Sequence, residues 1–340
     1  MDWEGRCIRV CAASLLCAAM LRMTASGALA PLGQALTDPN LASFLVYMQT
    51  GRVVRLSPKP PEVPLPALTH AVTEPPTEPE QPPTEPEKPV FCAEDFSRVE
   101  VKYRCDYRPD MEALMQEPLD WDLYSEDPAV LILHTHATES YTRCPGDTYT
   151  ETGAYRTLDP GYNVQSLGAL LTDRLKEAGI TVLHDTAFHD YPSYNGSYEN
   201  AAASTEEILA KHPNIQLILD LHRDAADTPT GQLVTQCSIG METAAQLMMV
   251  VGTDADGLEN PDWQDNLSLA LKLHAQLEKD HPGICRPINF THYRYNQHLG
   301  GRALIIEVGA AGNTLPQAKL AVNALADAII TLSNGTSSPN

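Results

Sequence analysis

From about Phe91 onward, short apolar runs alternate with segments of helix length, and this alternation restricts the folds open to the chain. Short apolar runs bounded by turn residues are typical of buried strands, and the segments between them are long enough for helices. The predicted strands are 129–133, 180–183, 215–221, 247–251 and 303–308, and the predicted helices are 163–178, 198–211, 264–279 and 315–332. Because strands that alternate with helices pair in parallel and are covered on both sides, we predict an α/β fold with a mostly parallel central sheet and helices on both faces.

The first residues of the chain predict a leader. Val10 to Leu21 is an uncharged apolar run between Arg9 and Arg22. The run is shorter than the roughly 20 residues of a comfortable membrane span, but it is typical of the apolar region of a signal sequence. We therefore predict a signal sequence or membrane anchor at residues 1–32, and we expect the rest of the chain to be extracytoplasmic, membrane-anchored or exported.

A proline-rich stretch separates this leader from the folded part. Prolines are dense in residues 57–90, and EPPTEPEQPPTEPEKP at 74–89 is an acidic near-repeat. Proline removes backbone donors and favours the extended polyproline II conformation, which builds no core. We predict a linker at 57–90, preceded by a juxtamembrane segment at 33–56 and followed by one folded domain at 91–340.

Charge and cysteine spacing exclude two classes of function. The formal net charge is −21 and the isoelectric point is about 4.8. Nucleic-acid binding needs clustered Lys and Arg to neutralise phosphates, so we predict no nucleic-acid partner. No CxxC spacing occurs in the sequence, and a cysteine-based zinc site is therefore unsupported.

Groups that bind metals or move protons follow three of the predicted strands. His134, His136 and Glu139 come after the strand at 129–133, and His222 follows the strand that ends at Leu221. Glu307 follows three apolar residues of a later strand. Because the carboxyl ends of parallel strands meet at one edge of a sheet, these groups should converge. Two imidazoles and a carboxylate around an open position describe a catalytic zinc site, and a carboxylate at an apolar strand end suits proton transfer.

Six stretches together resemble the stage II sporulation protein P family, membrane-anchored cell-wall hydrolases of endospore-forming bacteria. They are VLILHTHATESY, HDYPSYNGSY, LILDLHRD, VVGTDADG, RYNQHL and ALIIEVGAAGNTLPQA, between about residues 128 and 330. The resemblance implies a fold like that of zinc N-acetylmuramoyl-L-alanine amidases, amidase activity and stem-peptide cleavage on peptidoglycan. It also implies a role in sporulation and engulfment, with a lytic transglycosylase and a membrane scaffold as partners.

The resemblance also implies roles for particular residues. His222 matches the later zinc ligand, and Glu307, in IEVG, matches the catalytic acid/base. The ligand after the first strand is His134 or His136, since alternate residues of an extended chain point the same way. For the carboxylate ligand, the spacing before the helix at 163–178 favours Asp159, with Glu139 and Glu151 as alternatives.

Polar and aromatic residues in predicted loops suit the binding of glycan and peptide amides. The predicted substrate-binding residues are Tyr194, Asn195, Arg223, Arg294, Asn296 and Gln297. We predict a zinc-dependent N-acetylmuramoyl-L-alanine amidase domain at 91–340. The alternatives are a stem-peptide endopeptidase on the same scaffold and a catalytically silent peptidoglycan-binding module.

Overall fold

The computed structural model describes residues 91, 93–229 and 231–334. The predicted leader at 1–32, the juxtamembrane segment at 33–56 and the linker at 57–90 lie outside the described residues. Within the described residues, none of the helices combines the length and apolar character that crossing a bilayer requires.

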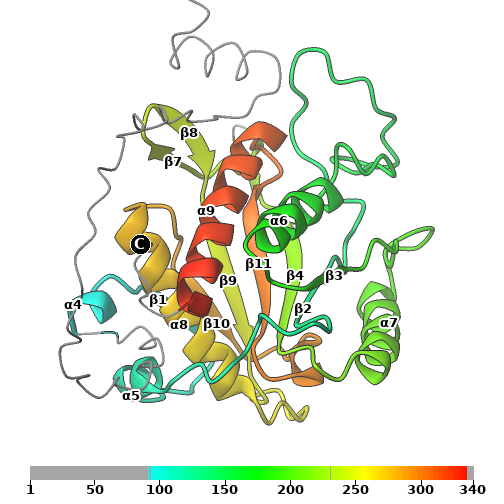
Figure 1. Cartoon of the computed structure of the whole chain (residues 1–340). Coiled ribbons are helices and arrows are strands. Elements are labelled where there is room, and N and C mark those ends of the chain that lie inside the picture. The colour runs from blue at the N-terminus through cyan, green and yellow to red at the C-terminus, as the bar shows by residue number, and fades with distance from the viewer. Residues whose placement is uncertain (1–90, 92, 230, 335–340) are drawn as a thin grey trace, which may run out of the picture. The chain divides into compact units, whose positions relative to one another are not determined.

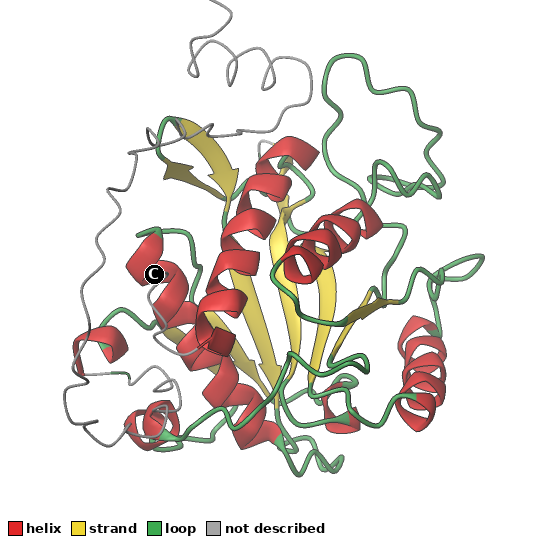
Figure 2. Ribbon diagram, in the orientation of Figure 1, coloured by secondary structure: helices red, strands yellow, loops and turns green. Residues whose placement is uncertain are grey.

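One seven-stranded sheet forms the centre of the domain (Figures 1 and 2). In spatial order its strands are β1 (Val101–Arg104), β10 (Ile288–Thr291), β9 (Leu247–Gly252), β11 (Ala303–Ala310), β4 (Leu217–Asp224), β2 (Val130–Leu133) and β3 (Val182–His184). Only the β9–β11 pair among these neighbours is antiparallel, so the predicted mostly parallel sheet is confirmed. Two small hairpins lie outside this sheet: β5 (Asp227–Thr228) with β6 (Gly231–Gln232), and β7 (Gln236–Ile239) with β8 (Glu242–Ala245).

Helices pack on both faces of the sheet, also as predicted. The described helices are α4 (Ala93–Phe96), α5 (Met111–Gln116), α6 (Gln165–Glu177), α7 (Ser197–Lys211), α8 (Trp263–Asp280), α9 (Leu315–Asn334) and the 3-10 helix η1 (Gln297–Leu299). Figure 1 shows α6, α8 and α9 in front of the sheet, and side chains of α7 pack behind it.

The alternation of side chains along each strand explains this division. In β2, Val130 and Ile132 belong to the main core, whereas Leu131 and Leu133 belong to a smaller cluster that includes Ala201 of α7. Successive side chains of a strand point to opposite faces, so the smaller cluster defines the face that α7 covers. We call it the α7 face.

The same alternation places chemistry on the α7 face. Ile218 of β4 belongs to the smaller cluster, and Asp220 and His222 follow it at intervals of two residues. Ala303 of β11 also belongs to that cluster, and Glu307 is four residues further along the strand. The polar groups of β4 and β11 therefore reach the α7 face near the carboxyl ends of these strands.

Candidate active site

His136 lies just after β2 among aromatic rings. Its ring stacks on Tyr194, with centroids 4.5 Å apart and planes 12° apart, and meets the Tyr198 ring edge-on at 5.5 Å. Burial, followed by the nearby His222, lowers the pKa of His136 to about 4, so its imidazole is neutral at pH 7. Nδ1 of His136 is buried and has no hydrogen-bond partner among the described residues. A neutral imidazole with a free ring nitrogen can bind a metal ion.

His222, in β4, lies between two carboxylates. Its ring centroid is 5.3 Å from that of His136, and its Nδ1 is 3.7 Å from Oε2 of Glu139. Its Nε2 is 2.9 Å from Oδ1 of Asp220, although the alignment is too poor for a good hydrogen bond. Burial alone would lower the pKa of His222, but Asp220 and Glu139 outweigh burial and raise it to about 10. Asp220 therefore holds one ring nitrogen, while the other faces Glu139 and the site.

Asp220 and Glu139 are themselves held in place. The backbone N–H and hydroxyl of Thr135 donate to the two Asp220 oxygens at 2.8 and 2.6 Å. The backbone N–H of Arg223 donates to Oε2 of Glu139 at 3.1 Å. The guanidinium groups of Arg223 and Arg156 lie 3.5 and 3.6 Å from Oε1 of Glu139. These contacts restrict the rotation of both carboxylates and fix their oxygens toward His222.

Glu307, in β11, is opposite His222 in the strand register. Its Oε2 is buried without a hydrogen-bond partner among the described residues. Burial, with His222 acting against it and Glu139 and Asp224 adding to it, raises the pKa of Glu307 to about 8; Arg223 also opposes the shift. A carboxyl group with a pKa near neutrality can both accept and return a proton at physiological pH.

His134 faces away from this cluster. Its Nδ1 is 3.0 Å from the Leu221 carbonyl, to which only a protonated nitrogen can donate, and its Nε2 is 2.9 Å from Nε2 of His184. Gly168 of α6 leaves room for this pair, because a Cβ at that position would overlap both imidazoles. Both ring nitrogens of His134 are thus already engaged, and of the two candidates after β2, His136 is the one placed beside His222.

Two of the three candidate carboxylate ligands lie elsewhere. Asp159 is exposed, and its Oδ1 accepts a hydrogen bond from Gly161 N at 2.9 Å. Glu151 is also exposed and forms an ion pair with Arg143 at 3.1 Å. Glu139 is 5% exposed and adjoins His222. The spacing favoured Asp159, but the alternative Glu139, which follows the turn after β2, is the carboxylate that lies beside His222.

The predicted substrate-binding residues are divided between surface and interior. Tyr194 and Asn195 are exposed. Arg223 is buried, and its guanidinium donates to the carbonyls of Ser140 and Tyr155, both at 3.0 Å. These hydrogen bonds hold the guanidinium of Arg223 within the fold.

The RYNQHL segment contributes in different ways. Gln297 is buried, accepts from Gly252 N and donates to the Val250 carbonyl, both at 2.7 Å. Asn296 donates to the Tyr198 carbonyl at 2.8 Å, and Arg294 donates to the Glu259 carbonyl at 3.1 Å. The amide of Gln297 is used within the fold, and the substrate-binding roles of all six residues remain predictions.

Asp220 and Arg156 are residues that the sequence reasoning missed. For Asp220 a signal existed, because in LILDLHRD it precedes His222 by two positions and so lies on the same face of the strand. Arg156 gave no such signal. It reaches Glu139 from a long loop and also donates to Oδ2 of Asp190 at 2.7 Å.

The side chains at the site are of the types that bind zinc, but in this structure they do not yet surround a position for a metal ion. Among the described residues, no three His, Cys, Asp or Glu side chains are already arranged to hold a metal ion. Nδ1 of His136 nevertheless has no hydrogen-bond partner within the described part of the chain, and Nδ1 of His222 lies beside Oε2 of Glu139. Two His and one Glu form a known catalytic zinc set, and ligating His residues characteristically have a carboxylate near their other nitrogen. Nε2 of His222 lies 2.9 Å from Oδ1 of Asp220.

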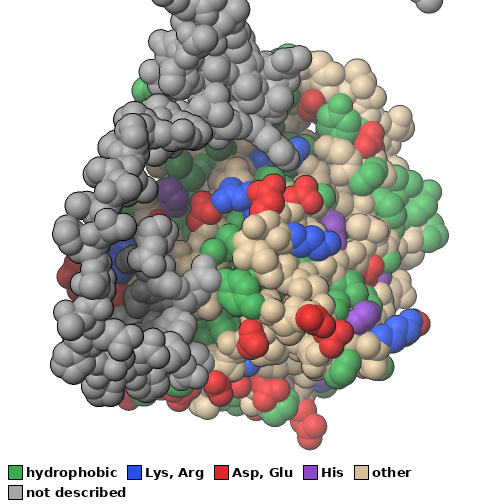
Figure 3. All heavy atoms as spheres, in the orientation of Figure 1, with side chains coloured by type: hydrophobic (Ala, Val, Ile, Leu, Met, Phe, Trp, Pro, Cys, Tyr) green, Lys and Arg blue, Asp and Glu red, His purple; other side chains and the backbone are tan. Residues whose placement is uncertain are grey.

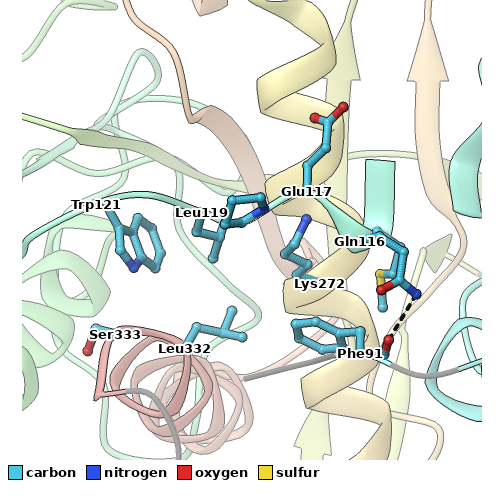
Figure 4. A pocket seen from close by; sticks show the side chains of 10 residues that line it. Phe91, Gln116, Glu117, Leu119, Trp121, Lys272, Leu332 and Ser333 are labelled. Atoms are coloured by element: carbon cyan, nitrogen blue, oxygen red, sulfur yellow. Dashed lines mark hydrogen bonds between the residues drawn. The ribbon is translucent and has the colours of Figure 1, made fainter. Parts of the chain in front are cut away.

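A separate cavity of about 140 Å³ lies between α5, α8 and the end of α9 (Figure 4). Its lining includes Phe91, Leu119, Trp121 and Leu332, with Lys272 pointing inward from α8. None of the clustered histidines and carboxylates described above lines it. It is therefore not part of the candidate active site.

Comparison of the sequence with known proteins identifies the family of the chain. The sequence model of Stage II sporulation protein P matches residues 71–330. The chain belongs to that family. A curated member of the Stage II sporulation protein P family, from Bacillus subtilis (strain 168), is 29% identical over 211 residues, which are 58% of this chain and 49% of the relative. The chain thus aligns with about half the length of that relative.

Several solved structures share a weaker likeness. An N-acetylmuramyl-L-alanine amidase of Mycobacterium abscessus has a TM-score of 0.36 at 11% identity, covering 60% of this chain and 97% of the amidase. An N-acetylmuramoyl-L-alanine amidase of Clostridium difficile 630 has a TM-score of 0.34 at 14% identity, covering 61% and 95%. At these TM-scores the likeness carries no argument about activity. The fold is described from the sheet and helices above.

Proposed function

We propose that the chain is a zinc-dependent peptidoglycan hydrolase that cuts the amide between the lactyl group of N-acetylmuramic acid and L-alanine. One observation carries the proposal: His136, Glu139 and His222 gather beside Glu307, a buried carboxyl group whose Oε2 has no hydrogen-bond partner among the described residues. Membership of the Stage II sporulation protein P family supports a role in sporulation and a cell-wall substrate.

His136, Glu139 and His222 would hold the metal. The zinc, when bound, lowers the pKa of a coordinated water and polarises the scissile carbonyl. Asp220 keeps the imidazole of His222 oriented, and Arg223 and Arg156 hold the carboxylate of Glu139.

Glu307 would move the proton. Its unprotonated Oε2 takes a proton from the attacking water, and the same oxygen then donates it to the leaving amine of L-alanine. The lactyl–alanine C–N bond breaks, and the products are a free carboxylate and a free amine. A pKa near 8 makes the return of the proton easy, since the protonated form is stable at neutral pH.

The competing functions predict different residues or products. A silent binding module gains nothing from a buried unpartnered carboxyl group, which costs stability. A stem-peptide endopeptidase would use the same cluster, and only its products distinguish it. An extracytoplasmic location and an anchor within residues 1–32 remain parts of the proposal that rest on the apolar run at 10–21. Partnership with a transglycosylase and a membrane scaffold remains a part that rests on the resemblance.

The decisive test is mass spectrometry of purified peptidoglycan after digestion with the zinc-loaded protein. Amidase activity releases stem peptides that begin with a free L-alanine amine and leaves peptide-free glycan. Asp159→Asn should digest as the wild type does, whereas His222→Ala should not. Fragments cut only within the stem peptide would replace the amidase with an endopeptidase, and intact peptidoglycan with a zinc-loaded wild type would contradict hydrolysis altogether.

A further inference from the structure

An open groove of about 520 Å³ leads away from the candidate active site. It lies between α7, the loop after β9 and the segment after β10. Its lining residues are Tyr198, Glu199, Ala202, Glu206, Asp256, Leu258, Tyr293, Arg294, Tyr295, Asn296 and His298. Tyr198 joins the groove to the site, because its ring also contacts His136.

Three tyrosine rings form a continuous row along the groove, which we call the tyrosine row. The centroids of Tyr198 and Tyr295 are 5.7 Å apart, and those of Tyr295 and Tyr293 are 6.3 Å apart. Tyr293, at the outer end, is 55% exposed. The row therefore begins at a proposed zinc ligand and ends in solvent.

The backbone holds the middle ring of the row in an uncommon conformation. Tyr295 has a φ of 53°, in the left-handed region that residues other than glycine rarely occupy. The side chain of Asn296 fastens this segment to α7 through the Tyr198 carbonyl. Such strain persists only where the surrounding structure enforces it, and it is concentrated at functional sites.

Two side chains that line the groove each have a polar atom without a partner among the described residues. Nε of Arg294 and Nδ1 of His298 are buried and make no hydrogen bond with the described residues. Burial lowers the pKa of His298, so this imidazole is neutral at pH 7 and can donate or accept. The side chains of Arg294 and His298 line the groove, so a ligand that lies over the rings meets hydrogen-bonding groups there.

Charge decides which part of a peptidoglycan substrate this groove favours. Among the described residues that line it, Glu199, Glu206 and Asp256 are acidic, and Arg294 is the one Lys or Arg. Stem peptides carry free carboxylates, which this acidic lining repels. The glycan strand is neutral where its lactyl groups are amide-linked, and the apolar faces of sugar rings pack well on aromatic rings.

We propose that this groove binds the glycan strand of peptidoglycan, with consecutive N-acetylhexosamine rings over the tyrosine row. The proposal rests on the proposed function and specifies which half of the substrate lies on this side of His136. The stem peptide then leaves the site away from the groove. Tyr293 contacts a sugar remote from the scissile bond and acts in binding alone.

The test uses the metal-free full chain and chitotetraose, a neutral tetramer of N-acetylglucosamine without any peptide. Because chitotetraose has no lactyl amide, its binding is independent of cleavage and of zinc. Tyr293→Ala should weaken binding by about tenfold in titration calorimetry, the scale expected for loss of one aromatic contact. Tyr103→Ala, which removes a tyrosine of β1 that is 37% exposed, should leave binding unchanged.

A free stem tetrapeptide separates the glycan from the peptide as occupant. We expect no competition between the tetrapeptide and chitotetraose. Failure of the wild type to bind chitotetraose, equal binding by Tyr293→Ala, or displacement by the tetrapeptide would each overturn the glycan assignment. Binding of chitotetraose by a protein that never cleaves peptidoglycan would retain the groove and reject the proposed activity.

Discussion

Two buried ionisable groups, Lys272 and Glu307, have opposite surroundings. The Lys272 amine lies beside the cavity of Figure 4 and donates to the Leu114 carbonyl at 2.7 Å and to the Ser268 hydroxyl at 2.6 Å. Glu307 leaves Oε2 buried without a partner among the described residues. Burial shifts the pKa of each toward neutrality, to about 8 in both cases. A shifted pKa alone therefore does not identify a functional group; Glu307 differs from Lys272 by its unpartnered oxygen together with its place beside His222.

The first prediction compares the effects of replacing Glu307 and Lys272 on peptidoglycan cleavage. Glu307→Gln keeps the shape of the side chain but cannot accept a proton, so peptidoglycan cleavage should fall by about 100-fold or more. Lys272→Met preserves the length of the side chain, and Ser268 still donates to the Leu114 carbonyl. Cleavage by Lys272→Met should equal that of the wild type. Release of stem peptides from labelled cell walls, with zinc content measured in parallel, gives both values.

Either of two results would contradict this difference between Glu307 and Lys272. Near-normal turnover by zinc-loaded Glu307→Gln would remove Glu307 from proton transfer. An equally large loss in a well-folded Lys272→Met protein would show that the partnered amine also takes part in function.

The second prediction concerns thermal stability of the chelator-treated protein. The folded pKa of Glu307 is raised from 4.5 to about 8, so its stabilising contribution is complete below pH 4.5 and is lost as pH rises through about 8. Glu307→Gln has no such loss. Its melting temperature should exceed that of the wild type by several degrees at pH 9, about 2–4 °C for each kcal/mol recovered, and by much less at pH 5. Calorimetric scans at the two pH values measure the difference, and an advantage that does not grow with pH would contradict the burial of an unpartnered carboxyl group.

The sequence predicted five of the seven strands of the sheet but missed β1 and β10, and it did not decide the choice among ligands. Apolar runs located β2, β4 and β11 because their cores are nearly continuous in Leu, Ile and Val. The spacing-based choices were weaker. His134 and His136 have the same parity, but only packing against Gly168 shows that His134 turns inward toward α6.

The antiparallel junction and the groove depended on contacts that are distant in sequence. No pattern in residues 247–251 reveals that β9 runs against β11. The row formed by Tyr198, Tyr293 and Tyr295 joins a helix start to a loop nearly a hundred residues away, and only the folded chain aligns these rings.

The third and smallest effect belongs to Lys272. Its pKa is lowered from 10.5 to about 8, so the related stability is present above pH 10.5 and is lost as pH falls through about 8. Relative to Lys272→Met, the wild type should therefore gain melting temperature between pH 7 and pH 10. We expect about 1–2 °C, because the amine retains two acceptors that offset the cost of burial. A relative loss over that range would mean that Lys272 is not desolvated.

Zinc stoichiometry of three proteins tests the central claim, that His136, Glu139 and His222 form the metal site beside Glu307. The wild type, His136→Ala and His134→Asn are stripped with chelator, reloaded, dialysed and analysed for zinc, and their melting curves verify folding. The wild type and His134→Asn should each retain about one zinc per chain, as a catalytic site requires, whereas His136→Ala should retain less than about a tenth of that. Full occupancy in folded His136→Ala together with loss in folded His134→Asn would place the metal on the other face of the sheet and contradict the account.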